Sequence, residues 1–225
     1  GTYRFRRQFV EALILRGDCV ALSCPDGSYA AKFEALGVKV MRQPVDRRGL
    51  DPLTDAALFF SYRALMRREK PDAVFTYTIK PNIYGALAAR SLRIPCIATI
   101  TGLGTALGKT GPLRSLLIFL CRHAFRHVAS VFFQNSADRD FFQKHGIPCG
   151  KARLTAGSGV DVEDFAFQSM PEQDGTVFLF AGRILREKGI VEFLEAARMV
   201  KARHPEASFL AAGPLEDISL RPIIS

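Results

Sequence analysis

The fold is decided by residues 176–213, TVFLFAGRILREKGIVEFLEAARMVKARHPEASFLAAG. Two short apolar runs, residues 176–182 and 207–213, enclose a helical pattern that extends from Glu187 to His204. Strands that are apolar along their whole length, joined by an amphipathic helix, are typical of a βαβ unit with parallel strands. This stretch therefore predicts a parallel sheet.

The same alternation runs through the earlier part of the chain. Helical patterns separate short apolar runs at residues 18–25, 38–44, 72–78, 95–102, 130–135 and 152–157. A parallel sheet built this way has helices on both of its faces. We predict an α/β fold of doubly wound, Rossmann-like domains.

The predicted elements divide the chain into two domains. Residues 160–175 are polar and acidic and contain Pro171 and Gly175, as interdomain linkers often do. We expect an N-terminal domain over 1–159, a linker over 160–175 and a second domain that begins at 176. Only two strands and one long helix follow the linker, and no strand precedes the first helix. We therefore expect both domains to be incomplete, as in a piece of a longer protein.

The composition limits the class of protein. With 225 residues and 48% hydrophobic content, the chain can form a substantial core. The longest purely apolar run, Leu116–Cys121, is far below the roughly 20 residues of a membrane span. The five cysteines show no C-x-x-C spacing, which argues against a disulfide framework and a zinc site. We predict reduced thiols and a cytoplasmic location.

Charge is distributed unevenly along the chain. Residues 1–150 carry 22 Lys and Arg against 11 Asp and Glu, a balance of 22 − 11 = +11. Residues 151–225 carry 9 against 11, a balance of 9 − 11 = −2. The first part is therefore expected to face an anionic partner, which can be a nucleic acid, a phospholipid surface or a phosphorylated substrate.

The turn at residues 182–189 has the chemistry of a diphosphate site. Gly182 follows a buried strand and lets a ligand approach the backbone, while Arg183 can grip two phosphate oxygens in a fork. Lys188 adds a compact charge beside the predicted helix N-terminus. The alternative is that Arg183 and Lys188 only solvate a strand-to-helix turn, and the residues alone do not decide between the two.

The glycine-rich segment at residues 102–110, GLGTALGKT, matches neither common nucleotide motif. A P-loop requires glycine at position 103 and a dinucleotide fingerprint requires it at 107, and leucine stands at both. Since the segment follows a predicted strand, we interpret it as a substrate loop, with a plain tight connection as the alternative.

Two basic segments leave alternatives open. The predicted helix over residues 113–128 carries His123 and His127 four apart, but no third ligand accompanies them, so we predict no metal. Arg and apolar side chains on this helix suit either a membrane interface or a core helix with a basic edge. At the N-terminus, Arg and aromatic residues alternate over residues 3–9. Because no nucleic-acid module is present, a substrate phosphate is favoured there over nucleic acid.

Taken together, these segments resemble family 4 of the glycosyltransferases, which have two facing Rossmann-like domains in the arrangement called GT-B. The resemblance rests on FLFAGRILREKGIVEFLEAARMVK, on ARLTAGSGVDVEDF and on VFFQNSADRDFF. GTYRFR at residues 1–6, KPNIYG at 80–85 and ITGLG at 100–104 resemble the branch that extends sugars on undecaprenyl diphosphate.

The resemblance implies roles for particular residues. Gly182, Arg183 and Lys188 would bind the donor diphosphate, and Arg183 and Lys188 would stabilise the leaving nucleoside diphosphate. It also implies retention of anomeric configuration, a UDP-sugar donor, no metal or other cofactor, and a lipid-diphosphate acceptor at the inner face of a bacterial membrane. The residues expected to contact the acceptor are Gly1, Thr2, Arg4, Lys80, Asn82, Gly102 and Gly104.

Two departures from the family pattern remain. No histidine or acid stands near Thr101 and Gly102, so no general base is carried over. The family's E-x7-E region would lie beyond Ser225, and we expect this chain alone to be inactive. The rival interpretations are a UDP-sugar epimerase of similar architecture, although a histidine-rich cleft is lacking, and a non-catalytic basic module that binds membranes or polyanions.

Overall fold

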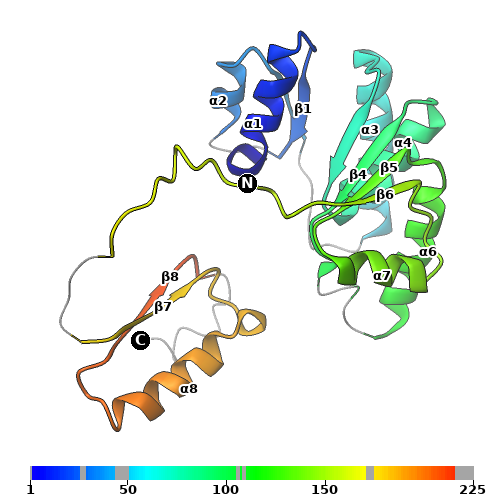
Figure 1. The fold of residues 1–225 in the computed structure, drawn as a ribbon. Helices are drawn as coiled ribbons and strands as arrows, with labels where there is room; N and C mark the ends of the chain where they lie inside the picture. Colours follow the sequence, from blue (N-terminus) through cyan, green and yellow to red (C-terminus); the bar gives the residue numbers. More distant parts are fainter. Residues whose placement is uncertain are drawn as a thin grey trace. The chain divides into compact units, whose positions relative to one another are not determined.

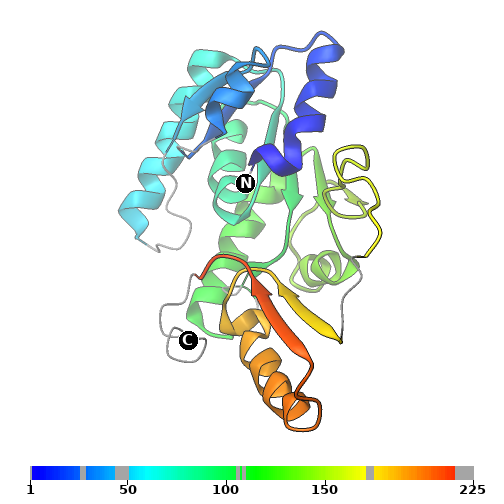
Figure 2. The same cartoon turned by 90° about the vertical axis from the view of Figure 1, so that its left-hand side faces the viewer.

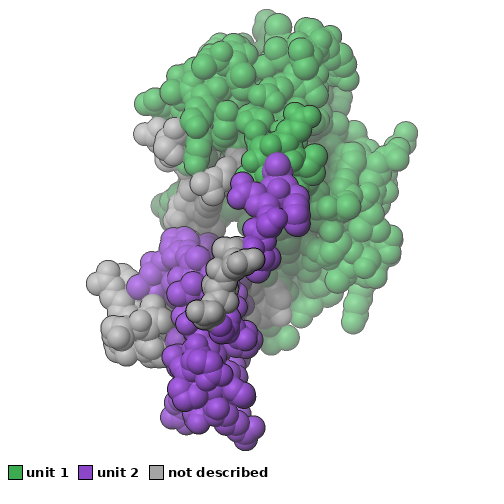
Figure 3. Space-filling view, turned by 60° about the vertical axis from the view of Figure 1, so that its left-hand side comes forward, with its two compact units in different colours: residues 1–165 green, residues 166–225 purple. Residues whose placement is uncertain are grey.

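The computed structural model describes residues 2–25, 29–43, 51–104, 107, 110–170 and 175–215, apart from the side chains of Thr2 and Arg4. The chain forms two compact units, Gly1–Phe165 and Ala166–Ser225 (Figure 3). The boundary between them falls inside the range predicted as a linker.

All strands of the first unit pair in parallel. They form a two-stranded and a four-stranded sheet, with the order β3-β4-β5-β6 in the larger one. The strands are β1 (Ala21–Cys24), β2 (Lys39–Arg42), β3 (Val74–Tyr77), β4 (Cys96–Ile100), β5 (Ser130–Phe133) and β6 (Lys151–Leu154). The first five lie within their predicted runs and β6 begins one residue before its run, which confirms the strand positions.

The larger sheet and the smaller one are joined by side chains and not by a backbone ladder. Helix α1 (Thr2–Leu15) buries Val10 against Phe33 and Val38 of the smaller sheet's core. From the same helix, Phe9 meets Phe75 of β3 edge-on at 5.2 Å, and Arg6 lies 4.2 Å over the Tyr77 ring. Among the described strands, helix packing thus takes the place of hydrogen bonding between the two sheets.

Capping side chains set the starts of two helices of the first unit, α3 (Pro52–Glu69) and α7 (Ser136–Lys144), which Figure 1 labels. Asp51 accepts hydrogen bonds from the amides of Leu53 and Thr54 at the start of α3, and Asn135 caps α7 through the amide of Asp138. The helices are α2 (Ala30–Glu34), α3 (Pro52–Glu69), α4 (Ala86–Ser91), α6 (Pro112–Ala124) and α7 (Ser136–Lys144). The helix predicted over 113–128 becomes a 3₁₀ turn, η2 (Phe125–His127), after Ala124.

The core of the larger sheet is closed by tight helices and by aromatic packing. Ala86, Ala88 and Ala89 of α4 are almost fully buried, so the small side chains bring this helix close to the strands. Phe142 of α7 is fully buried and meets Phe133 of β5 edge-on at 5.2 Å. Such burial stabilises the unit through the removal of apolar surface from water.

The second unit is one βαβ element, as residues 176–213 predict. β7 (Val177–Ala181) pairs in parallel with β8 (Ser208–Ala212), and α8 (Ile190–Lys201) lies along this pair (Figure 2). The helix begins three residues later than predicted. Gly189 has a φ of 84°, which separates α8 from a short 3₁₀ turn, η3 (Arg186–Lys188).

Helix α1 is also held by the turn at residues 161–165. Asp161 accepts hydrogen bonds from Gln8 at 2.7 Å and from Arg7 at 3.3 Å, and its carboxylate caps the turn through the amides of Glu163 and Asp164. Asp164 pairs with Arg7 at 3.0 Å. Hydrogen bonds from Glu163 and Gln8 lower the pKa of Asp161 below its usual value.

This contact should depend on pH. Because the folded-state pKa of Asp161 is lowered, its contribution is present above the ordinary carboxyl pKa and is lost as pH falls through the lowered value. In an Asp161→Asn variant, the side-chain oxygen still caps the turn but the charge opposite Arg7 is gone. We expect faster amide exchange around Gln8 at neutral pH, as in acidified wild type, while the Glu163 amide stays protected. Asp161→Ala should release both. Equal exchange at Gln8 in wild type and Asp161→Asn would contradict the assignment.

Candidate functional site

Two loops meet at the carboxyl edge of the larger sheet, where β3 and β4 end. The non-glycine residue Thr78 follows β3 with a φ of 69°, and Gly102 and Gly104 follow β4 with φ of 113° and 67°. Left-handed backbone at a threonine costs free energy and concentrates at functional positions. Since β3 and β4 are parallel neighbours, both loops lie on the same edge, where open α/β sheets bind ligands.

Asn82 connects the segment after β3 to strand β4. It lies in the π-helical turn η1 (Pro81–Gly85), a helix variant often found at functional sites. Its side chain is only 1% exposed, and its Nδ2 donates to the carbonyl oxygen of Thr99 at 2.9 Å. Its Oδ1 is buried, and no described group donates a hydrogen bond to it. A buried hydrogen-bond acceptor without a donor costs about 1–3 kcal/mol. The Oδ1 atom of Asn82 is thus available to accept a hydrogen bond at this edge of the sheet.

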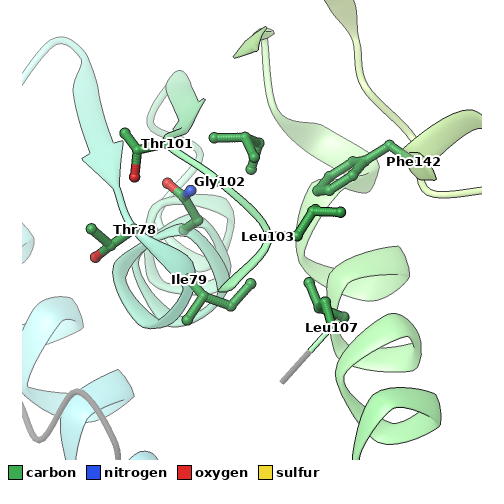
Figure 4. Close-up of a pocket in the computed structure, with 9 residues that line it drawn as sticks. Thr78, Ile79, Thr101, Gly102, Leu103, Leu107 and Phe142 are labelled. Carbon is green, nitrogen blue, oxygen red and sulfur yellow. The ribbon is translucent and has the colours of Figure 1, made fainter. Parts of the chain in front are cut away.

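The space beside Asn82 is small. A cavity of about 10 Å³ is lined by residues of both loops, with Leu107 and Phe142 closing its apolar side (Figure 4). This is at the lower limit of the room that one water needs. The cavity can hold a water on Asn82 Oδ1, and it is too small for a sugar. It is therefore not itself a substrate pocket.

Lys80, predicted to bind an acceptor phosphate, has a partner inside the protein. Its ammonium is 2.6 Å from the Asp55 carboxylate of α3, and the Tyr84 hydroxyl donates to the same carboxylate at 2.8 Å. Burial, together with the Asp55 hydrogen bond, raises the pKa of Tyr84. Lys80 is 8% exposed and its charge is compensated, so the structure gives it a role in joining α3 to η1.

The N-terminal acceptor residues lie largely outside the described part of the chain. Gly1 is not described, and for Thr2 and Arg4 only the backbone of α1 is. Their predicted roles stay predictions. The neighbouring Arg6 and Arg7 are described and contact Tyr77 and the 161–165 turn, so both contribute to holding α1 in place.

The predicted diphosphate turn has the local geometry that the sequence suggests. Gly182 follows β7 directly, and the side chains of Arg183 and Lys188 are exposed on either side of buried Ile184 and Leu185. The amides of Lys188 and Gly189 bond back to Leu185 and Arg186, which forms the turn that precedes α8. Two exposed cations thus flank a strand-to-helix turn with the positive end of α8 beside it.

Gly213 fixes the position of Gly182, a role that the sequence analysis missed. The Gly182 amide donates to the carbonyl oxygen of Ala212 at 2.9 Å. Gly213, which follows β8 directly, lies so close that a Cβ on it would be 1.7 Å from the Gly182 carbonyl oxygen. The Ala-Ala-Gly end of the second apolar run was the available signal, since glycine at a strand end often marks close backbone approach. The missing side chain of Gly213 therefore allows the backbone to take its position at Gly182, where the predicted diphosphate turn begins.

Helix α6 has a buried face and an exposed apolar face, which leaves both predicted alternatives open. Cys121 and Ala124 are buried, whereas Leu116 and Phe119 are 54% and 55% exposed. Arg114 lies 3.2 Å from His145, and Arg122 donates to the His145 carbonyl oxygen at 2.7 Å. Among the described residues, no three His, Cys, Asp or Glu side chains gather as metal ligands do, and no helix is long and apolar enough to span a membrane.

Comparison with known proteins places the chain in a family context. Residues 1–156 match the family described as "Glycosyl transferase 4-like domain". The chain is 26% identical over 228 residues to N,N'-diacetylbacillosaminyl-diphospho-undecaprenol alpha-1,3-N-acetylgalactosaminyltransferase of Campylobacter jejuni, with 94% of this chain and 60% of the relative covered. It is 23% identical over 226 residues to UDP-Gal:alpha-D-GlcNAc-diphosphoundecaprenol alpha-1,3-galactosyltransferase of Escherichia coli, with 95% and 58% covered.

Among solved structures, the chain resembles Anabaena HepE in complex with UDP and glucose. The TM-score is 0.68 at 15% identity, with 98% of this chain and 60% of HepE covered. At this identity the likeness concerns the fold alone, and it confirms the predicted α/β fold of the GT-B class. The chain spans about 60% of the length of the curated relatives that it matches.

Substituting Gly213 tests its contact with the diphosphate turn. We expect Gly213→Ala to force the backbone at Gly182 apart and to lower the unfolding free energy of the second unit by more than about 2 kcal/mol. Gly175→Ala is the matched control, because Gly175 also has a positive φ but a Cβ there would make only a 3.4 Å contact. It should cost about 1 kcal/mol from backbone strain. Hydrogen exchange of the β7 and β8 amides measures both, and equal effects would refute the close-approach argument.

A double-mutant cycle separates the two roles of Lys80. Lys80→Met leaves the partly buried Asp55 carboxylate without its cation, and loss of one partner of a buried ion pair costs about 3–5 kcal/mol. Adding Asp55→Leu removes the orphaned charge and should recover much of that loss in denaturant unfolding. If Lys80→Met left stability unchanged, the ion pair would have no structural role and the phosphate role would regain support.

Proposed function

The chain belongs to the glycosyl transferase 4-like domain family, and from this premise we propose that it acts as a glycosyltransferase. The donor is a UDP-sugar, and the acceptor is a saccharide carried on a lipid diphosphate. The sugar moved is a hexose or N-acetylhexosamine. The product contributes to a bacterial surface polysaccharide or related glycan.

The acceptor class is supported by the two curated relatives together. Their names give the diphospho-undecaprenol group as the carrier in both, while the transferred sugars differ, N-acetylgalactosamine in one and galactose in the other. Both align with more than nine-tenths of this chain, including the β3 and β4 loops at the carboxyl edge. The carrier is thus the common element, and the sugar is the variable one.

The donor class is supported by the turn at residues 182–189. Arg183 and Lys188 present two positive charges beside a helix N-terminus, an arrangement that suits a diphosphate. HepE, which shares the fold, was solved with UDP and glucose. The observation that carries the proposal is this pair of exposed cations at the end of β7, next to the close contact between Gly182 and Gly213.

The chemistry follows from charge. As the glycosidic bond to the donor breaks, negative charge grows on the departing diphosphate, and fixed cations stabilise it more in the transition state than in the bound donor. The acceptor hydroxyl attacks from the face that the diphosphate leaves, which retains the anomeric configuration. The reaction uses no metal and no pair of spaced carboxylates of the hydrolase type.

A membrane location accompanies a lipid-linked acceptor. We propose that the protein works as a peripheral enzyme at the cytoplasmic face of the bacterial inner membrane. The balance of +11 over residues 1–150 favours anionic headgroups. The same charge would serve a non-catalytic membrane-binding module, and activity is what separates the two.

Activity of the full-length protein tests the proposal. With a UDP-sugar and an undecaprenyl-diphosphate-linked saccharide, Arg183→Ala and Lys188→Ala should each lower kcat by about 10²–10³-fold, because each removes charge from the developing anion. Arg198→Ala is the matched control. It removes an exposed arginine from the last turn of α8, at the end away from the diphosphate turn, and should leave kcat within about twofold.

Three other results would count against the proposal. Unchanged turnover in both Arg183→Ala and Lys188→Ala would remove the diphosphate assignment. Interconversion of UDP-sugars without transfer would favour an epimerase. Binding to anionic vesicles by a full-length protein that never transfers or hydrolyses a UDP-sugar would favour the non-catalytic module.

A further inference from the structure

The first unit has a groove that the transferase chemistry does not use. It has a volume of about 760 Å³, within the range of small-molecule sites, and it lies between α3 and α6 with α4 as its floor. Its walls are mostly apolar and include Phe59 of α3, Leu87 of α4, and Leu116, Leu117 and Leu120 of α6. An open apolar groove of this size on a water-exposed face indicates a binding surface.

The two ends of the groove differ in chemistry. At one end, Asp55 and Tyr84 contribute polar atoms, and both belong to the cluster that Lys80 neutralises. Tyr84 is four residues after Lys80, and α3 also begins near this end, so this end adjoins the carboxyl edge of the sheet where the acceptor loops lie. At the other end, Arg90 and Ser91 close α4. The groove therefore runs along α4, away from the acceptor edge.

The charges around the groove suit an anionic amphiphile. Arg90 lines the groove, and α6, which forms one wall, carries no acid. Arg114 and Arg122 of α6 contact His145 and do not line the groove. The one acid in the lining, Asp55, is paired with Lys80 and does not present an uncompensated negative charge to a phosphate. A ligand with a long apolar chain would meet apolar walls along the groove, the neutralised Lys80–Asp55 pair at one end and the positive charge of Arg90 at the other.

We propose that this groove binds the isoprenoid chain of the lipid-linked acceptor. The proposal rests on the proposed function for the identity of the lipid and goes beyond it in assigning the chain a site on the protein. The diphosphate stays at the carboxyl edge, the first isoprene units lie over Tyr84 and Leu87 between α3 and α6, and the chain passes Arg90 on its way to the membrane.

Binding of short isoprenoid phosphates tests the site without a donor. In calorimetric titrations of the chain, geranyl, farnesyl and geranylgeranyl phosphates should bind saturably, each added isoprene unit tightening binding by at least about tenfold until the groove is filled. Inorganic phosphate and diphosphate should bind far more weakly. Affinity that does not depend on chain length would overturn the proposal.

Helix α6 offers a matched pair of variants. Leu116 lines the groove and Phe119 does not, yet the two are 54% and 55% exposed on the same helix. Leu116→Glu should weaken farnesyl phosphate binding by more than about tenfold, because it places a charge on the apolar wall. Phe119→Glu adds the same charge to the same helix and should change binding by less than about threefold. Equal losses in both would indicate general adsorption and would overturn the groove assignment.

Other occupants give distinct results. If the groove is an interface with a second copy, sedimentation will show a dimer that Leu116→Glu dissociates and farnesyl phosphate does not. If another segment of the full-length protein fills it, the longer protein will fail to bind farnesyl phosphate while the 225-residue chain binds it. Either result would overturn the proposal.

The outcome is separable from that of the proposed function. Transfer by the full-length protein that is equally efficient with short-chain and long-chain acceptors, and unaffected by Leu116→Glu, would remove the groove and leave the transferase intact. Chain-length-dependent binding that Leu116→Glu abolishes, in a protein that transfers no sugar, would leave the groove and remove the transferase.

Discussion

Parallel pairing of the strands is the constraint on which the rest of the structure depends. Since every described strand pair runs in the same direction, each strand ends on the same edge of its sheet, and the loops that follow are gathered there. The β3 and β4 loops meet at Asn82 for this reason, and the β7 and β8 ends bring Gly182 against Gly213. Strand direction, rather than contact between side chains, thus makes neighbours of residues that are distant in the sequence.

Buried charge imposes a second constraint. Lys80 and Asp55 lie close to the sheet edge with little exposure, and an isolated ion there would be costly unless it were paired and hydrogen-bonded. Tyr84 completes the pair by donating to Asp55. The result joins α3 to η1 and also leaves no uncompensated negative charge in the adjoining groove.

The two units contribute different chemistry to the proposed reaction. The proposal assigns the acceptor loops and the apolar groove for the lipid to the first unit, and the two cations for a diphosphate to the second. The family membership and the names of the relatives fit this division, since a carrier lipid common to both relatives matches features of the first unit, whereas the donor chemistry belongs to the second. A transferase of this kind separates recognition of the acceptor from activation of the donor.

The sequence alone determined the eight strands and the turn between β7 and α8, because strand periodicity and the glycines at 182 and 189 are local properties of the chain. The diphosphate role of that turn and the acceptor role of Asn82 stay predictions. Only the tertiary structure decided that Lys80 is paired with Asp55, 25 residues away, that Arg7 is held by Asp161, and that Gly213 abuts Gly182. Each of these contacts joins residues brought together by strand order and helix packing, and no local pattern records such pairings.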